Sequence, residues 1–382
     1  MSGAALGEME AAPEADCAPG APHPRHAPAL HGQAAAERGF LEAFAADRLH
    51  HAWLITGPRG VGKATLAWRI ARFLLAQPAR QEAGLFGDAP PPPETLDLPD
   101  DHPIARRMAA LAEPRLCLIR RAWDVKKGKH GATISVDEVR KLNGFFHMSA
   151  ADGGRRVVIV DSADEMNTAA ANALLKTLEE PPALSTLLLI SHQPSRLLPT
   201  IRSRCRELRL APLAPAPLAR ALDAAGFDAA DNSDALAELS AGSVGEALRL
   251  SNQDGTQTYG ELVALFETCP RLDRPRALKL AESCVGAANV DRYELLIGLI
   301  DRFLSRLART GAGLPPLVEA ARGEAALLQR LAPRGPSAQS WATLQQELSA
   351  RATHARAVNL DPAALILDMV FKINDTASRV AA

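Results

Sequence analysis

Residues 57–63 read GPRGVGK, and this stretch decides the fold. A continuous apolar run over residues 52–56 precedes it, and a helical pattern over residues 64–76 follows it. Glycines let backbone N–H groups turn toward a phosphate, the helix start adds positive potential, and a lysine reaches the outer phosphates. The spacing therefore predicts a phosphate-binding loop whose nucleotide-binding residues are Gly57, Gly60, Gly62, Lys63 and Thr65.

The rest of the first half reads as strands between helices. The apolar runs are continuous rather than alternating, over residues 52–56, 116–120, 156–160 and 186–190. Strands that helices bury on both faces have this pattern, so we predict a parallel α/β sheet. A helical pattern over 34–49 comes before the first run, and the proline- and acid-rich residues 87–103 predict a surface loop.

After residue 210 the strand pattern stops. Residues 211–215 read APLAP, which is typical of a linker, and the patterns beyond them are helical. Residues rich in Ala, Pro, Gly and His open the chain without a hydrophobic period, which predicts a disordered tail. The predicted organisation is a tail over 1–28, an α/β domain over 29–210, a small helical domain over 211–254 and a second helical domain over 255–382.

Composition excludes several classes of protein. The 43 Lys and Arg residues balance 44 Asp and Glu residues, so the net charge of −1 excludes a basic protein that coats nucleic acid and an acidic tail protein. No apolar run approaches the roughly 20 residues of a membrane span, and no secretory signal pattern opens the chain. The five cysteines are scattered without a C-x-x-C pair. They predict free thiols in a reducing cytoplasm, with neither a disulfide framework nor a metal site.

The most specific stretch lies between residues 167 and 206. NALLKTLEEPP at 172–182 predicts a helix stopped by two prolines, and LPTIRSRC at 198–205 follows a buried run. With HAW at 51–53, these segments resemble the bacterial clamp-loader branch of the AAA+ proteins, and within it the delta-prime type of subunit. The resemblance covers about residues 30–250. It implies an α/β P-loop AAA+ domain with a parallel sheet, then a small helical lid domain and an all-α C-terminal collar.

Positions that ATP hydrolysis needs are changed in this chain. The residue after the loop lysine should offer a hydroxyl to Mg²⁺, but it is Ala64, and Thr65 lies about 100° further round the helix. Asp161 follows the predicted strand, where a carboxylate would hold Mg²⁺. Hydrolysing AAA+ relatives have a Glu after this Asp, but here Ser162 follows, and a serine is no general base near neutral pH. Asp164 is the candidate that could replace this Glu, but it is displaced by two residues and is expected to be the solvated start of a helix.

Two further departures point the same way. The predicted lid reads GSVG at 242–245, where hydrolysing relatives resemble Gly-Ser-x-Arg and the Arg touches nucleotide. Gly245 removes that contact, and Arg249 is expected to be a surface residue. The zinc-binding cysteines common in the family are missing between residues 78 and 102. The resemblance therefore implies a degenerate acidic motif, ATP or ADP bound without hydrolysis, and no zinc.

SRC at 203–205 carries an arginine finger in the family, which reaches the ATP of a neighbouring subunit. The resemblance thus implies that Arg204 is a catalytic residue in trans. An arginine is always charged, and its planar fork places two donors on phosphate oxygens. The alternative is a solvated edge on which arginines alternate, and we expect this for Arg202 and Arg206.

Weaker signals leave alternatives open. KKGKH at 126–130 is either a sequence-independent contact to primer-template phosphates or a solvated loop. The histidines His23, His26 and His31 lack partner ligands, so we expect no metal there. The tryptophans Trp53, Trp68 and Trp123 are expected to be core or interface anchors rather than platforms for nucleic-acid bases.

The leading hypothesis is a cytoplasmic clamp-loader subunit with little or no ATPase or polymerase activity of its own. Its expected partners are the gamma/tau and delta subunits and, transiently, the sliding clamp and primer-template DNA. The alternative is an active clamp-loader ATPase of the gamma/tau type, which Ala64, Ser162 and Gly245 disfavour. A plain DNA-binding module is disfavoured by the neutral charge.

Overall fold

The computed structural model describes residues 14–17, 21–27, 29–78, 92–147, 154–227, 233–333, 335, 337–358 and 360–381. The chain divides into two compact units, residues 1–213 and residues 214–382. This division lies three residues beyond the point where the strand pattern of the sequence stops. Each unit is described by itself.

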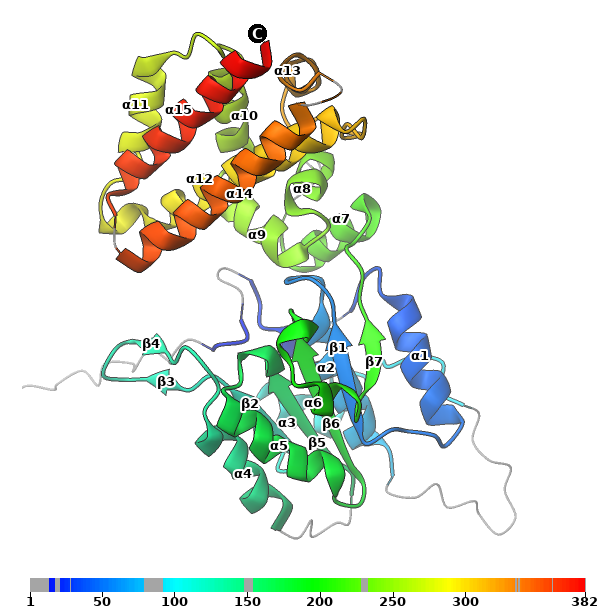
Figure 1. Ribbon diagram of the computed structural model, residues 1–382. Helices are drawn as coiled ribbons and strands as arrows, with labels where there is room; N and C mark the ends of the chain where they lie inside the picture. Colours follow the sequence, from blue (N-terminus) through cyan, green and yellow to red (C-terminus); the bar gives the residue numbers. More distant parts are fainter. Residues whose placement is uncertain are drawn as a thin grey trace, which may run out of the picture. The chain divides into compact units, whose positions relative to one another are not determined.

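The first unit contains a five-stranded parallel sheet (Figure 1). Its spatial order is β2-β5-β6-β1-β7. The predicted parallel sheet is confirmed, and each predicted strand is present within one residue of its expected bounds. The strands are β1 Ala52–Thr56, β2 Leu116–Arg120, β5 Arg156–Asp161, β6 Ser185–Ser191 and β7 Arg206–Arg209.

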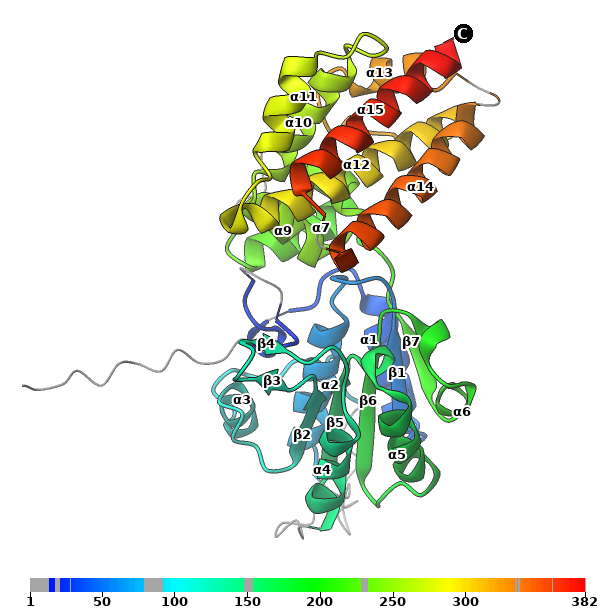
Figure 2. The same cartoon turned by 60° about the vertical axis from the view of Figure 1, so that its left-hand side comes forward.

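Helices cover both faces of this sheet. Ala52 and Leu54 of β1 pack into one apolar cluster with residues of α4 and α5. Trp53 points to the other face, where its ring lies 5.1 Å from that of Phe40 in α1. Figure 2 shows α4 and α5 together on one side of the sheet. The helices are α1 Ala34–Ala45, α2 Lys63–Ala76, α3 Pro103–Ala109, α4 Val136–His147, α5 Thr168–Glu179 and α6 Pro199–Arg202.

Local sequence sets the ends of α5. The side chain of Asn167 accepts the backbone N–H of Ala170 at 2.8 Å and so caps the helix. At the other end the helix stops at Glu179, just before the two prolines that predicted its end. The motif 172–182 therefore places Glu179 at the C-terminal end of a capped helix.

Short elements complete the first unit. β3 Trp123–Asp124 and β4 Lys129–His130 form an antiparallel hairpin, so the predicted basic loop spans its turn and β4. The described residues of the unit also form the 3₁₀ helices η1 Pro24–His26, η2 Ala163–Glu165 and η3 Pro194–Arg196. Residues 92–102 of the predicted surface loop form neither helix nor strand, and its residues 87–91 lie outside the described residues.

The prediction of a disordered tail is wrong for residues 14–17 and 21–27. His23 is only 6% exposed, and its ring lies 5.6 Å from that of Trp68 in α2. The guanidinium of Arg72, one turn further along α2, donates to the carbonyl of Ala27 at 3.2 Å. Ion pairs and these contacts with α2 order a segment that has no hydrophobic period of its own. The remaining residues of the predicted tail lie outside the described residues.

In its described residues the second unit is built of helices, as the sequence predicted. Its core includes the fully buried side chains of Tyr259, Phe266, Phe303 and Trp341. The rings of Phe266 and Phe303 stack with centroids 4.8 Å apart. The helices are α7 Pro215–Ala224, α8 Ser233–Ser240, α9 Val244–Asn252, α10 Gly255–Phe266, α11 Arg274–Glu282, η4 Ala287–Asn289, α12 Val290–Gly311, α13 Glu324–Leu331, α14 Ser337–Val358 and α15 Pro362–Ala381.

A buried ion-pair cluster joins the region of the predicted lid to that of the predicted collar. Arg306 of α12 contacts Glu238 of α8 at 2.7 Å and Glu324 of α13 at 2.6 Å. Because these contacts cross residues 254 and 255, the two predicted domains lie within one compact unit here. The boundary between a lid and a collar stays a prediction.

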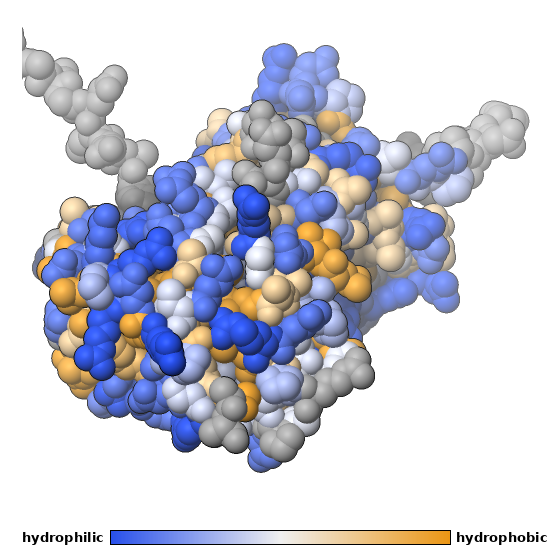
Figure 3. Space-filling view, turned by 90° about the horizontal axis from the view of Figure 1, so that it is seen from above, coloured by the Kyte–Doolittle hydropathy of each residue, from blue (hydrophilic) through white to orange (hydrophobic). Residues whose placement is uncertain are grey.

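The surface is mainly polar on the face that Figure 3 shows, and apolar residues gather there in separate patches. Single exposed apolar side chains are ordinary on a folded protein. In the described part of the second unit the large exposed ones are Leu278, Val285, Val290, Leu314, Leu317, Val358, Leu360 and Phe371. Among the described residues, no helix has both the length and the apolar composition to cross a membrane.

Candidate nucleotide site and arginine finger

The loop between β1 and α2 has the glycine geometry that the sequence predicted. Gly57, Gly60 and Gly62 have φ of 141°, 74° and 96°, which a residue with a side chain rarely adopts. A Cβ at Gly57 would lie 2.5 Å from the carbonyl oxygen of Leu210. Both the backbone angle and the close approach therefore require glycine at position 57.

Lys63 begins α2 and is only 3% exposed. Its ammonium donates to the carbonyl oxygen of Gly57 at 2.8 Å and to that of Pro58. Burial lowers the pKa of Lys63 to about 8, although the negative charges of Asp161 and Asp164 act against this shift. Lys63 thus bonds its own loop, and Thr65 lies one residue on from Ala64 in the first turn of α2.

Asp161 ends β5 and lies in a hydrogen-bonded chain with Ser162 and His192. The hydroxyl of Ser162 donates to Asp161 Oδ1 at 2.9 Å, and its oxygen lies 2.8 Å from His192 Nε2. Burial, aided by the charge of Asp16, raises the pKa of Asp161 to about 7. Burial and the charges of Lys63 and Arg59 lower the pKa of His192 to about 4, so its ring is neutral at pH 7.

His192 is a site residue that the sequence did not identify, and Asp164 is one whose environment it predicted wrongly. Asp164 was expected to be solvated, but it is only 6% exposed. Its carboxylate accepts the backbone N–H groups of His192 at 2.9 Å and Gln193 at 3.2 Å. These bonds tie the residues after β6 to those after β5. Their proximity could have been predicted from the order of the strands, because the carboxyl ends of parallel strands meet at one edge of a sheet.

The residues fit a phosphate better than they fit a magnesium ion. The glycine conformations and the helix start at Lys63 form a cradle for phosphate oxygens. Mg²⁺ prefers hydroxyl and ionised carboxylate oxygens, but Ala64 offers no hydroxyl. The Asp161 carboxyl already accepts the Ser162 hydroxyl, and its raised pKa favours the neutral form. The arrangement is suited to nucleotide binding and poorly suited to metal-assisted hydrolysis.

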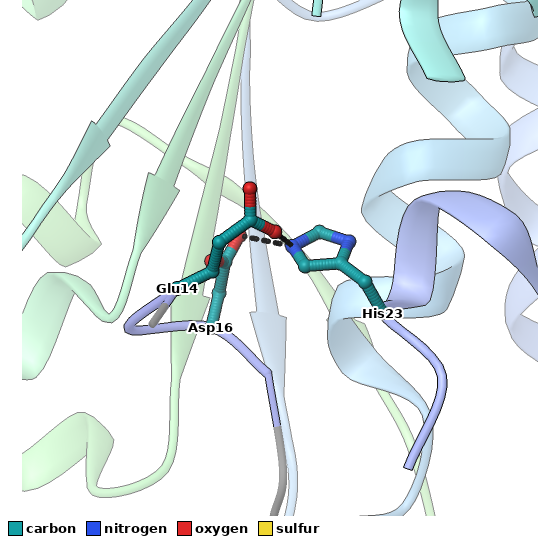
Figure 4. Close-up of side chains that lie close together, drawn as sticks. All are labelled: Glu14, Asp16 and His23. Carbon is teal, nitrogen blue, oxygen red and sulfur yellow. Dashed lines mark ion pairs between the residues drawn. The ribbon is translucent and has the colours of Figure 1, made fainter. Parts of the chain in front are cut away.

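The N-terminal segment adds a charged cluster beside this edge (Figure 4). Asp16 pairs with Arg120 at the end of β2 at 2.5 Å, and Arg25 pairs with Glu14 at 2.5 Å. His23 Nε2 lies 3.0 Å from Glu14 and 3.1 Å from Asp16. Two carboxylates and an imidazole at this spacing resemble a cation site. Each carboxylate already has a guanidinium partner, so we describe the group as an ion-pair cluster.

Arg204 follows α6, with its side chain 36% exposed. Its Nη1 donates to the carbonyl oxygen of Thr200 at 2.9 Å, and its Nη2 lies 2.9 Å from Glu179 Oε1. The neighbouring arginines differ from it. Arg202 and Arg206 are both exposed, and the guanidinium of Arg206 also lies over the ring of Trp53 at 5.1 Å. Of the three arginines on this edge, Arg204 is therefore the one that an ion pair to α5 holds in place.

The remaining predicted site residues lie on other elements. Gly245 lies in the first turn of α9, and Arg249, expected at the surface, is partly buried and pairs with Glu246 at 2.7 Å. In the hairpin, Lys126 and Lys127 of the turn and Lys129 of β4 are all exposed. Both interpretations of this turn stay open.

Comparison with known proteins finds similar sequences for most of the first unit. Residues 32–214 match the family described as DNA polymerase III, delta subunit. The DNA polymerase III subunit delta' of Pseudomonas aeruginosa is 40% identical over 219 residues, which are 56% of this chain and 59% of that protein. The subunit delta' of Escherichia coli is 37% identical over 220 residues, 57% of this chain and 59% of that protein.

A gamma/tau subunit is also similar. The DNA polymerase III subunit gamma/tau of Mycobacterium tuberculosis is 32% identical over 168 residues, 42% of this chain and 24% of that protein. The chain spans about three fifths of the length of the two delta' relatives that it matches. Over about half of its length the chain is therefore similar to the delta' and gamma/tau subunits of DNA polymerase III, which confirms the resemblance that its motifs predicted.

Proposed function

We propose that this chain is a non-hydrolysing clamp-loader subunit of the delta-prime type. In this role it presents Arg204 to ATP bound by a neighbouring motor subunit while the assembly places a sliding clamp on primed DNA. Its partners are the gamma/tau and delta subunits, and the helices of residues 255–382 hold it in the ring. Any ATP or ADP at its own loop, Gly57 to Lys63, is bound without hydrolysis.

The observation that supports this most directly is a contrast between two sites. Arg204 is partly exposed and charged, so it is accessible to an anion from outside the chain. At the chain's own loop, Ala64 stands where a hydroxyl would bind Mg²⁺, and Ser162 stands where a carboxylate would activate water. A chain with these features is equipped to assist a neighbour's hydrolysis and poorly equipped for its own.

The physical value of such an arginine is large. The γ-phosphoryl group carries charge on three oxygens in the transition state. A guanidinium supplied in trans stabilises this charge and raises the rate of hydrolysis by about 10³–10⁵-fold. Removing Arg204 should therefore affect turnover by the neighbour far more than it affects assembly.

The test is ATP turnover by a reconstituted clamp loader that contains the Arg204→Ala variant. We expect turnover stimulated by clamp and primed DNA to fall at least about tenfold, since the finger acts on the chemical step. Size-exclusion chromatography should show the assembly intact. Arg202→Ala, two residues away and exposed, is the matched control and should retain turnover. Unchanged ATP turnover with Arg204→Ala would contradict the proposal.

The alternative is an active ATPase of the gamma/tau type, which the similarity to a gamma/tau subunit keeps in view. It predicts robust ATP turnover by the isolated chain that Lys63→Ala abolishes. Our proposal predicts no turnover by the isolated chain above that of the Lys63→Ala variant. Measuring phosphate release from both purified proteins distinguishes the two functions.

A further inference from the structure

Glu179 connects the longest motif of the chain to the arginine after α6. It is the last residue of α5, and its Oε1 lies 2.9 Å from Arg204 Nη2. The carbonyl oxygen of Thr200 accepts from Arg204 Nη1, also at 2.9 Å. The guanidinium is thus held from two directions, by an ion pair with a side chain of α5 and by a hydrogen bond to the backbone of α6.

The ion pair and the hydrogen bond together restrain the guanidinium. An arginine has five N–H donors in a rigid fork, and the hydrogen bond to Thr200 uses one of them, on Nη1. Other N–H groups of the fork remain for an external anion. A free arginine loses on the order of 2 kcal/mol of rotamer entropy when it is immobilised. A guanidinium that is already held loses less of this entropy when it meets a phosphate.

We infer that Glu179 is a positioning residue that holds Arg204 in the orientation it offers to a neighbour's phosphate. The inference rests on the proposed function of Arg204. Glu180 provides an internal comparison, because it is the next residue, carries the same charge and is exposed. Among the ion pairs of the described residues, the one at Arg204 is formed by Glu179.

The test uses the full chain in the reconstituted clamp loader, with Glu179→Ala as the main variant. We expect the maximal rate of stimulated ATP turnover to fall about two- to fivefold, the range of a single half-exposed ion pair, with KM for ATP unchanged. Glu179→Gln keeps an acceptor oxygen at the same reach and should recover part of the rate. Glu180→Ala should behave as the unchanged chain.

A double variant separates positioning from a general structural effect. If Glu179 acts through Arg204, then Glu179→Ala causes no further loss once Arg204→Ala is present. An additional loss in that background overturns the inference, and so does an equal loss with Glu180→Ala. Unchanged or faster turnover with Glu179→Ala alone also overturns it, since the pair would then be inert or would restrain the arginine. The proposed function fails separately, if the clamp loader that contains Arg204→Ala turns over ATP at the unchanged rate.

Discussion

Burial of Asp161 makes the stability of the first unit depend on pH. The pKa of Asp161 is raised to about 7, so the folded state favours the protonated carboxyl. The stabilisation from this group is complete below the ordinary carboxyl pKa of about 4 and is lost as the pH rises to 7. Asp161→Asn removes the titration. The variant should gain stability relative to the unchanged chain between pH 4 and pH 7, by at most about 4 kcal/mol.

Urea unfolding of both proteins at several pH values checks this prediction. The comparison must be made between variant and unchanged chain, because His192 acts in the opposite direction. Its pKa is lowered to about 4, so its stabilising effect is present above pH 6.5 and is lost as the pH falls to 4. A difference between the two proteins that does not change with pH would contradict the prediction.

For single residues, the sequence could predict site residues that lie close together along the chain but not contacts between distant ones. Gly57 and Lys63 lie within one short motif, and Asp161 directly follows a predicted strand, so spacing alone singled them out. His192 and Asp164 are 28 residues apart, and their contact exists only because β5 and β6 end at the same edge of the sheet. No local pattern marks such a pair.

Among the elements, burial decided which strands the sequence predicted. All residues of β1 and β6 are buried, and their continuous apolar runs were recognised. β7 is an edge strand in which only Leu208 is buried, so it offered no apolar run. The two-residue strands of the hairpin are too short for any periodicity.

The N-terminal segment gives a prediction at the scale of an element. His23 and Arg120 lower the pKa of Asp16 despite the opposing effect of burial, so its ionised form supports the fold of this segment. Asp16→Asn should weaken the cluster by about 1–3 kcal/mol, between the values for exposed and buried pairs. Hydrogen exchange at residues 21–27 should then become faster. Glu94→Gln, at an exposed carboxylate, is the control. Equal exchange in the Asp16 variant and the unchanged chain would show that the ion pairs do not order the segment.

For the molecule as a whole, the sequence predicted the fold well where it contains recognisable motifs and poorly where it does not. The first unit contains a phosphate-binding loop and the segments 172–182 and 198–205, and its fold was predicted in most details. Residues 255–382 have helical patterns but no motif, so nothing indicated which helices pack together. The cluster of Arg306, Glu238 and Glu324 joins residues 68 and 18 positions away from Arg306. Periodicity does not reveal pairs at such separations.

That cluster gives the last prediction, because it is the main buried charge of the described second unit. Arg306 is 3% exposed and Glu324 is fully buried, and Tyr259 donates its hydroxyl to Glu324 at 2.5 Å. Arg306→Ala leaves a buried carboxylate without its cation, which should cost about 3–5 kcal/mol. Hydrogen exchange read by mass spectrometry should become faster in peptides of residues 214–382. Arg309→Ala, exposed and one turn further along α12, should leave exchange unchanged. If both variants behave alike, the buried pair does not stabilise this unit.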